Sequence, residues 1–256
     1  MAKATFRFYE ELNDFLPVDR RKQAFTLQFT DAVPVRHGIE TCGVPHTEIE
    51  VILVNGVSVD LEHRICDGDR ISIYPVFESL DVTPLLRLRP RTLRDPRFLA
   101  DAHLGRLAGY LRMLGFDTLF RNDWADDELA RRAAMEHRIL LTRDRALLMY
   151  KAVTHGCFVH EVKPPRQLAS LLERLDLCRR IRPFSRCIRC NDMLENVERE
   201  RVLEKVPPGI REGRREFFRC RGCGQVYWKG SHYARMKARI GASCPDWRES
   251  PQGDAD

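Results

Sequence analysis

The sequence predicts a multidomain protein of mixed α/β and α+β class, and three observations support this prediction. The first 80 residues alternate between short apolar strands and turns, residues 97–180 alternate between strand and helix patterns, and four cysteines near the C-terminus form two C-x-x-C pairs. A chain of 256 residues is also long for a single small domain. We therefore expect three modules in sequence.

The N-terminal module, residues 1–82, is predicted from the order of its elements. Strands are expected at residues 5–9, 24–29, 50–54 and 71–75, with one helix at residues 33–42 that Gly43 ends and a hairpin turn at Asn55-Gly56. This order suits a small β-grasp domain, and the segments LVNGVSVD and CDGDRISIYPVFE resemble the ThiS and MoaD type of ubiquitin-like fold. Those sulfur carriers end in a free Gly-Gly, whereas this chain continues through Glu78-Ser79-Leu80, which argues against sulfur carriage.

The middle of the chain begins with a predicted linker, residues 83–96. The segment LLRLRPRTLRDPR contains five arginines and two prolines, and its apolar residues show no helical or strand periodicity. These arginines either contact phosphate or belong to a solvated tether. Residues 97–180 then alternate, with strands expected at 98–100, 119–120, 139–142 and 158–162, and helices at 102–114, 127–136, 146–150 and 166–175. Such alternation is typical of a parallel α/β sheet with flanking helices.

The third module, residues 181–240, contains the paired cysteines Cys187, Cys190, Cys220 and Cys223. Each pair can present two thiolates to one ion, so the four predict a closed, structural zinc site, with a redox pair as the competing interpretation. The 29 intervening residues would be bridged by a hairpin through residues 197–206 and 216–218. Residues 241–256, rich in Pro, Ser, Gly and Asp, are predicted to be a disordered tail.

The other five cysteines stand singly and are predicted to be buried or bystander thiols: Cys42, Cys66, Cys157, Cys178 and Cys244. The N-terminus lacks the basic start, apolar core and small-residue cleavage site of a signal peptide, and no segment approaches the roughly 18 apolar residues of a membrane span. We therefore expect a cytoplasmic protein without a membrane partner.

The distribution of charge suggests a polyanionic partner. Residues 1–80 contain 8 Lys and Arg against 13 Asp and Glu, a balance of −5, and the remaining residues contain 35 against 24, a balance of +11. An asymmetry of this kind is typical of nucleic-acid binding, although a solvated Arg-rich surface is the alternative. Residues 181–240 alone contain 15 basic against 7 acidic side chains.

Candidate RNA-binding residues lie in the zinc module and beside the acids described below. The rings of Phe217, Phe218, Tyr227 and Trp228 lie among basic residues, which suits either base stacking or the core of a small module. His232 is an alternative zinc ligand, a phosphate contact or a packing residue. The predicted RNA contacts are Arg143, Arg145, Arg214, Arg215, Arg221, Lys229 and His232, with surface salt bridges as the alternative for the arginines.

Acidic residues follow two of the predicted parallel strands, where ligands bind in such sheets. Asp101 follows FLA and Asp144 follows ILLT closely, while Asp126, Asp127 and Glu128 begin a helix. Acids in a first helical turn have a structural explanation in capping and the helix dipole. Together, however, these carboxylates can hold one or two divalent ions that activate water, which predicts a metal-dependent nuclease.

Five segments carry a resemblance to a known family. They are FLADAHLGRLAGYLRMLGFDT at 98–118, DDELA at 126–130, RILLTRDR at 138–145, SRCIRCN at 185–191 and CRGCGQVYWKGSH at 220–232. In this order they are similar to the Mut-seven C-terminal RNase family, a branch of the PIN-like nucleases whose bacterial members often carry an N-terminal ubiquitin-like module. The resemblance implies a PIN-like fold and RNase activity with Mg²⁺ or Mn²⁺.

The resemblance also implies roles for individual residues. Asp101, Asp127 or its neighbour Asp126, and Asp144 match the family's metal ligands, with Thr142 supporting Asp144 through its hydroxyl. PIN nucleases usually have a fourth acid shortly after the T-x-D element, but Arg145 and two apolar residues follow here. A single-metal site, or a fourth ligand from Asp126 or Asp123, is therefore expected.

The combined prediction is a ribonuclease in which carboxylate-bound Mg²⁺ or Mn²⁺ activates water to attack an RNA phosphodiester, while the zinc module binds RNA. The β-grasp domain would take a protein partner. A non-catalytic RNA-binding or adaptor protein is the alternative, and a sulfur carrier is the third hypothesis.

Overall fold

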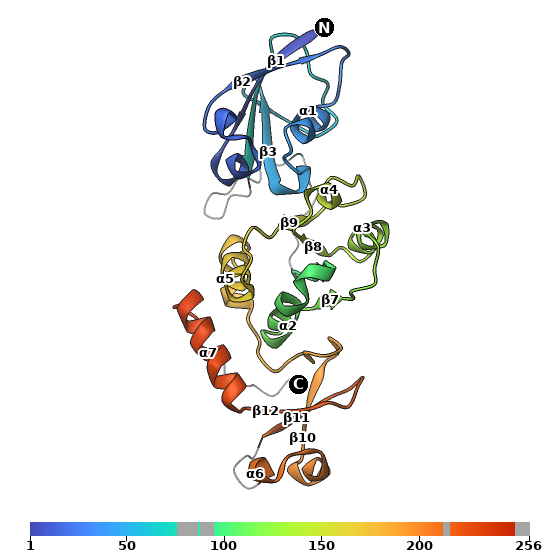
Figure 1. Cartoon of the computed structure of the whole chain (residues 1–256), viewed down its shortest axis with the longest axis vertical. Helices are drawn as coiled ribbons and strands as arrows, with labels where there is room; N and C mark the ends of the chain where they lie inside the picture. The colour runs from blue at the N-terminus through green and yellow to red at the C-terminus, as the bar shows by residue number, and fades with distance from the viewer. Residues whose placement is uncertain (76–86, 88–94, 212–215, 249–256) are drawn as a thin grey trace. The chain divides into compact units, whose positions relative to one another are not determined.

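The structure, a computed structural model, describes residues 1–75, 87, 95–211 and 216–248 (Figure 1). The side chain of His232 lies outside this description, as do most of the expected linker and the end of the expected tail. By contact density the chain divides into two compact units, Met1–Asp101 with Asp123–Phe158, and Ala102–Asn122 with Val159–Asp256. None of the described helices combines the length and apolar character needed to cross a membrane.

The first unit begins with a five-stranded sheet of order β2-β1-β5-β3-β4, in which β1 is antiparallel to β2 and parallel to β5. This topology confirms the β-grasp prediction. Its strands are β1 (Ala2–Phe8), β2 (Phe25–Phe29), β3 (Ile49–Val54), β4 (Val57–Val59) and β5 (Arg70–Pro75). β4, which was not predicted as a strand, follows the Asn55-Gly56 turn, whose φ angles of 51° and 86° suit the right-handed twist of a hairpin.

A helix and a set of buried aromatic side chains complete this domain. Alternate residues of β1 point inward, so Phe6 and Phe8 are fully buried in the core. Helix α1 (Val35–Thr41) ends before Gly43, which has a φ of 82°. A Cβ on Gly38 would lie 2.7 Å from the Phe6 ring, so glycine permits the close approach of α1 to the sheet. Three short 3-10 helices lie between these elements: η1 (Glu10–Phe15) and η2 (Val18–Arg20) between β1 and β2, and η3 (His46–Glu48) between α1 and β3.

The same unit contains three parallel strands, β6 (Phe98–Ala100), β8 (Ile139–Thr142) and β9 (Gly156–Phe158), with β8 between the other two. The prediction of a parallel sheet is confirmed. Helices α3 (Asp126–Met135) and α4 (Arg145–Leu148) accompany it. The last strand was predicted at 158–162 but ends at Phe158, and Val162 is exposed, because periodicity does not fix the register of a short apolar run.

The second unit contains η5 (Ala102–Leu104), α2 (Gly105–Met113), β7 (Thr118–Phe120), α5 (Pro164–Arg174) and η6 (Cys178–Arg180). Helix α2 packs against α5. Their buried leucines recur at helical spacing, as in Leu107 and Leu111 of α2 and Leu168 and Leu171 of α5.

The C-terminal module of this unit is a three-stranded antiparallel sheet, β10 (Leu194–Val197), β11 (Phe217–Cys220) and β12 (Val226–Trp228), followed by α7 (Ser231–Ser243). The predicted strand at 197–206 ends at Val197, and η7 (Arg199–Arg201), η8 (Leu203–Lys205) and α6 (Pro208–Arg211) follow. The predicted antiparallel hairpin is present as the pairing of β10 with β11, but its first strand was placed wrongly, because Val202 and Val206 are buried in a small core with Phe217 instead of alternating along a strand.

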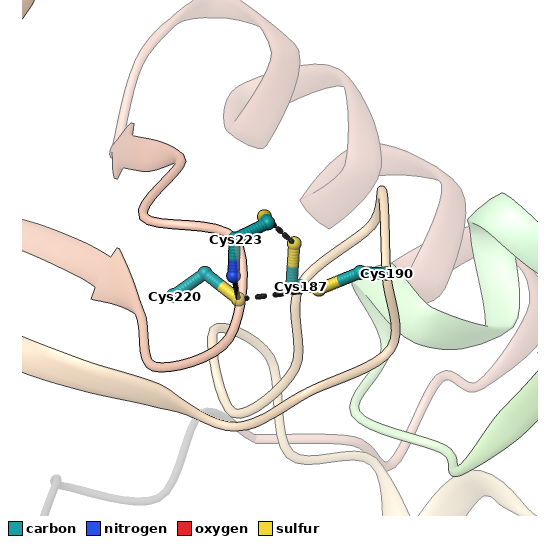
Figure 2. A group of neighbouring side chains, drawn as sticks. All are labelled: Cys187, Cys190, Cys220 and Cys223. Carbon is teal, nitrogen blue, oxygen red and sulfur yellow. Dashed lines mark hydrogen bonds between the residues drawn. The ribbon is translucent and has the colours of Figure 1, made fainter.

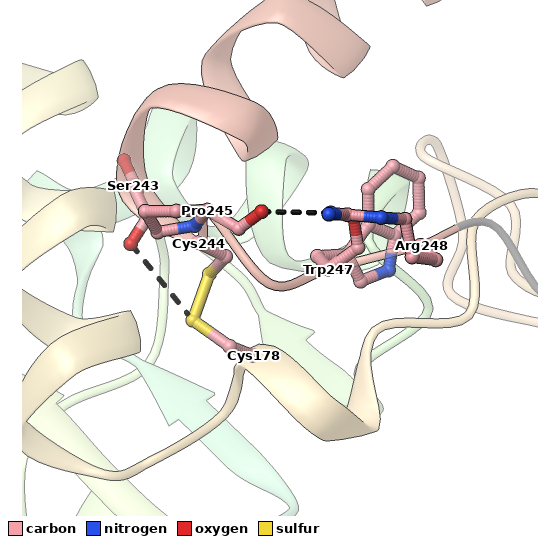
Figure 3. Close-up of a disulfide and its surroundings, with 6 residues drawn as sticks. All are labelled: Cys178, Ser243, Cys244, Pro245, Trp247 and Arg248. Atoms are coloured by element: carbon pink, nitrogen blue, oxygen red, sulfur yellow. Dashed lines mark hydrogen bonds between the residues drawn. A yellow bond between two sulfur atoms is a disulfide. The ribbon is translucent and has the colours of Figure 1, made fainter.

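A disulfide joins Cys178 to Cys244, across 66 residues of sequence that include the whole four-cysteine segment (Figure 3). The prediction of single thiols is therefore wrong for these two cysteines. Helix α7 was not expected, yet it packs against α5 and brings its C-terminal end to the start of η6. Cys42 and Cys157 are buried thiols, as predicted, and Cys66 is an exposed thiol.

Candidate active site and metal centre

Asp101 occupies the position directly after β6 that the sequence predicted. Its backbone N–H donates to the carbonyl of Leu141 at 3.0 Å, which extends the pairing of β6 with β8 by one residue. The residue is only 8% exposed. A carboxylate at this depth needs a polar partner, because an unpaired buried charge is costly.

Thr142, the last residue of β8, supplies that partner. Its hydroxyl donates to Oδ2 of Asp101 at 2.7 Å and accepts from the backbone N–H of Asp144 at 2.9 Å. One fully buried hydroxyl therefore connects the two strand-end acids. The sequence predicted that Thr142 would support Asp144 through its hydroxyl, and it does so at the backbone, while its donated hydrogen bond goes to Asp101.

Asp144 is exposed and caps α4. Its Oδ1 accepts from the N–H of Ala146 at 2.8 Å, which satisfies one of the unpaired amides of that short helix. This bond fixes the side chain relative to the backbone and engages one carboxylate oxygen.

Asp126 and Asp127 are exposed in the first turn of α3, where acids stabilise a helix N-terminus. Their neighbour Glu128 pairs with Arg131 and Arg132, whose hydrogen bonds hold its pKa below the usual value. In the described part of the chain, the candidate acids form no group of three or more that could hold a metal ion, whereas the four paired cysteines do, with ligand atoms that all lie within 4.8 Å of one another.

The four cysteines converge from two loops and could hold a metal ion such as zinc (Figure 2). Cys187 Sγ lies 3.6 Å from Cys223 Sγ, and Cys190 Sγ lies 3.3 Å from Cys220 Sγ. Cys187 and Cys220 are buried, whereas the second cysteine of each pair is exposed.

The thiols differ in acidity. Burial raises the pKa of Cys220 to about 12. Burial acts in the same direction on Cys187, but hydrogen bonds from the Tyr227 hydroxyl and the backbone outweigh it and lower its pKa to about 7. A metal ion bound by all four sulfurs would therefore have to displace the proton of Cys220, because the thiolate is the form that binds metal.

Arg112 anchors the first cysteine pair, a role that sequence reasoning missed. Its guanidinium is buried and donates to the carbonyl of Thr118 at 2.8 Å through Nε. Nη1 donates to the carbonyls of Ile188 and Arg189 at 3.0 and 3.1 Å. The only sequence signal was an arginine within an otherwise apolar face of α2, and it does not specify a partner 76 residues away.

Asn191, which directly follows the first pair, provides a second anchor. Its Oδ1 accepts from the N–H of Thr118 at 2.9 Å, and its Nδ2 donates to Asp117 at 2.8 Å. Asn191 has a φ of 72°, a left-handed conformation that asparagine tolerates better than most residues. The asparagine of SRCIRCN therefore ends the first cysteine knuckle and binds the start of β7 and the residue before it.

The predicted RNA contacts have varied surroundings. Arg143 is exposed, and Arg221 is exposed with its Nε 3.5 Å from a Glu195 oxygen. Lys229 pairs with Glu216 at 2.9 Å. Arg214, Arg215 and the His232 side chain lie outside the described residues.

Arg145 does not point to solvent as a phosphate contact would. Its Nη1 donates to the carbonyl of Phe15 in the ubiquitin-like domain at 3.1 Å.

Among the aromatic residues of the C-terminal module, Phe217 and Phe218 are buried, so they belong to its core and are not available for base stacking. The hydroxyl of Tyr227 lies 3.1 Å from Cys187 Sγ.

A family model described as the Mut7-C RNAse domain matches residues 96–240, more than half of the chain. The chain belongs to this family. A second model, Mut7-C ubiquitin, matches residues 1–81 of the Mut7-C chain, which confirms the ubiquitin-like module before the RNase domain. Searches of curated proteins and of solved structures found no significant match. Family membership suggests a nuclease-like function for this Mut7-C protein.

Proposed function

We propose that this Mut7-C protein is a ribonuclease that hydrolyses RNA phosphodiester bonds with one Mg²⁺ or Mn²⁺ ion held chiefly by Asp101 and Asp144. The observation that supports this most is the single Thr142 hydroxyl that joins the two acids at the ends of adjacent parallel strands. A divalent ion bound there would make water more acidic and offset charge on the phosphate.

The donor set suits such an ion. Thr142 engages Oδ2 of Asp101 and Ala146 engages Oδ1 of Asp144, and the second oxygen of each carboxylate has no hydrogen bond within the described residues. Mg²⁺ keeps several waters and is commonly held by one or two carboxylates, so a close group of four acids is not required. Asp126 and Asp127 are the proposed helical acids of the site, and Asp123 is an alternative to them.

The ion at the four cysteines is proposed to be zinc, with a structural role. A tetrahedral zinc with four thiolates places its sulfurs roughly 3.8 Å apart and leaves no position for water or substrate. The sulfur separations of 3.6 and 3.3 Å are close to that geometry. Elemental analysis of freshly purified protein should give about one zinc per chain, and a zinc-free, folded protein would contradict this assignment.

RNA is the proposed substrate, because residues 81–256 carry an excess of 11 positive charges (35 Lys and Arg against 24 Asp and Glu). Arg143 and Arg221 are exposed and Lys229 is half-buried beside Glu216. Arg214, Arg215 and His232 are proposed to contact RNA on the basis of the sequence alone.

The proposed location of the protein is the cytoplasm.

Cleavage of labelled RNA tests this function. Wild-type protein should cleave with Mg²⁺ or Mn²⁺ and stop when these ions are chelated, and Asp101→Asn and Asp144→Asn should cleave at background rates. Asp31→Asn, an exposed acid of the ubiquitin-like domain, is the matched control and should cleave at the wild-type rate. A wild-type protein that binds RNA but cleaves none with either ion would support the adaptor alternative.

A further inference from the structure

Arg145 connects the proposed active site to the ubiquitin-like domain. It follows Asp144 directly, and its guanidinium lies 4.9 Å from the centre of the Phe15 ring and 5.5 Å from that of Phe158. The two rings meet edge to face at 5.4 Å, and Arg145 also donates to the Phe15 carbonyl at 3.1 Å. The side chain is thus held by one hydrogen bond and two cation–π contacts.

Three further side chains of the ubiquitin-like domain reach the backbone of residues 149–158. The carboxylate of Glu48 accepts from the N–H of Phe158 at 2.5 Å. His46 Nε2 lies 2.8 Å from the Val153 carbonyl, and Arg36 donates to the Met149 carbonyl at 3.2 Å. Because these partners are backbone atoms, the contacts depend on the fold of the segment more than on its side chains.

These polar groups are built into the protein. Glu48 and His46 are 3% and 6% exposed. Glu40 lies behind them and receives bonds from Arg36 at 3.0 Å and His46 at 2.8 Å. Phe158 also packs against the apolar core of the ubiquitin-like domain. The side chains of this buried network must keep their hydrogen-bond partners, because a buried polar group without a partner is costly.

The contacted segment directly follows the T-x-D element, Thr142 to Asp144. Helix α4 has only four residues, from Arg145 to Leu148, and Asp144 is its N-cap. Arg145 is held at the start of this helix and Met149 at its end. A helix of four residues has little stability of its own, so these contacts fix the backbone that carries Asp144.

We propose that the ubiquitin-like domain is fixed to the part of the RNase domain that lies in the same unit, the parallel strands β6, β8 and β9 with α3 and α4. Arg145 is a positioning residue through which the ubiquitin-like domain holds Asp144. The domain thereby acts within its own chain, through η3 and Phe15, and is not a detachable carrier. The effect on metal binding rests on the proposed function, because it requires an ion at Asp101 and Asp144.

Arg145→Gln in the full chain tests the positioning role, with Arg20→Gln as the matched control. Arg20 lies 5.0 Å from the Phe25 ring, so the control removes a similar cation–π contact that involves only the ubiquitin-like domain. Arg145→Gln should raise the Mn²⁺ concentration for half-maximal RNA cleavage about tenfold or more, as other supporting residues of metal sites do. Arg145→Lys should restore part of the affinity because it keeps the charge. Equal Mn²⁺ dependence of Arg145→Gln and Arg20→Gln would overturn the proposal.

Hydrogen exchange tests the docking without relying on catalysis. The amide of Phe158 should exchange slowly in wild-type protein, and faster in Glu48→Leu and Arg145→Gln, while amides of β1 remain protected in all three proteins. Fast exchange of the Phe158 amide in wild-type protein would overturn the docking itself. A wild-type protein without Mn²⁺-dependent cleavage would instead contradict the proposed function, with slow exchange at Phe158 still supporting the docking.

Discussion

Thr142 and Asp101 share a hydrogen bond of 2.7 Å between a fully buried hydroxyl and a nearly buried carboxylate. Because the same hydroxyl accepts from the amide of Asp144, its removal would affect both proposed ligands. Thr142→Val keeps the size and branching of the side chain but leaves a buried carboxylate oxygen and an amide without their partner. Thr142→Ser keeps the hydroxyl and loses only a methyl group.

Thr142→Val should therefore lower the free energy of unfolding by about 1–3 kcal/mol and reduce RNA cleavage more than Thr142→Ser does. Urea denaturation gives the first quantity, and cleavage at saturating Mn²⁺ gives the second. Equal activity of the two variants would show that the hydroxyl does not organise the site.

Arg112 should be essential for the stability of the cysteine centre. Arg112→Met removes three hydrogen bonds to the carbonyls of Thr118, Ile188 and Arg189 while it keeps an apolar chain of similar length. We expect a loss of about 2–4 kcal/mol in the free energy of unfolding and faster release of the bound metal to a chelator. Arg106→Met, an exposed arginine on the same helix, should change neither measurement, and metal release at the wild-type rate from Arg112→Met would contradict the anchoring role.

The pairing of Glu40 predicts a loss of stability in acid. Burial raises the pKa of this carboxyl, but hydrogen bonds from His46 and Arg36 outweigh it, so the folded pKa lies below the usual value. The carboxylate therefore contributes its stabilisation above an unfolded pKa of about 4.3, and this contribution disappears as the pH falls through the folded pKa. Urea midpoints measured from pH 7 to pH 3 should fall less steeply below about pH 4.3 for Glu40→Gln than for wild-type protein. Identical slopes would exclude Glu40 as a source of the acid sensitivity.

Reduction of the Cys178–Cys244 disulfide should destabilise the second unit. Closing a loop of 66 residues corresponds to about 4 kcal/mol of chain entropy in the unfolded state. The denaturation temperature of wild-type protein should therefore be lower with a reductant present. Cys178→Ser should have this lower denaturation temperature both with and without the reductant. Cys66→Ser, which alters an exposed free thiol, serves as the control. A reductant with no effect on wild-type protein would contradict a stabilising role.

The elements that local patterns specify were predicted well. The strand order and the Asn55-Gly56 turn indicated the β-grasp domain, and the spacing within each C-x-x-C pair indicated the metal centre. Asp101 and Asp144 follow buried strands, so their positions at the strand ends were also predictable. Each of these features depends on residues that are close in sequence or on a repeating apolar pattern.

Features that depend on distant packing were not predictable. Arg112 donates to the backbone carbonyls of Ile188 and Arg189, which lie between the first two cysteines, and Arg145 donates to that of Phe15, 130 residues earlier. Every residue has a backbone carbonyl, so the sequence does not indicate which carbonyl accepts a given hydrogen bond. Similarly, Cys178 and Cys244 become neighbours only because α7, a helix of modest amphipathic character, packs against α5.

Mn²⁺ binding to the zinc-loaded full chain, measured by calorimetry in the absence of RNA, tests the proposed active site most directly. The account predicts one Mn²⁺ site per chain in wild-type protein and in Asp31→Asn, and its loss in Asp101→Asn and in Asp144→Asn, with all four proteins equally folded. Mn²⁺ binding of wild-type strength in both Asp101→Asn and Asp144→Asn would contradict it.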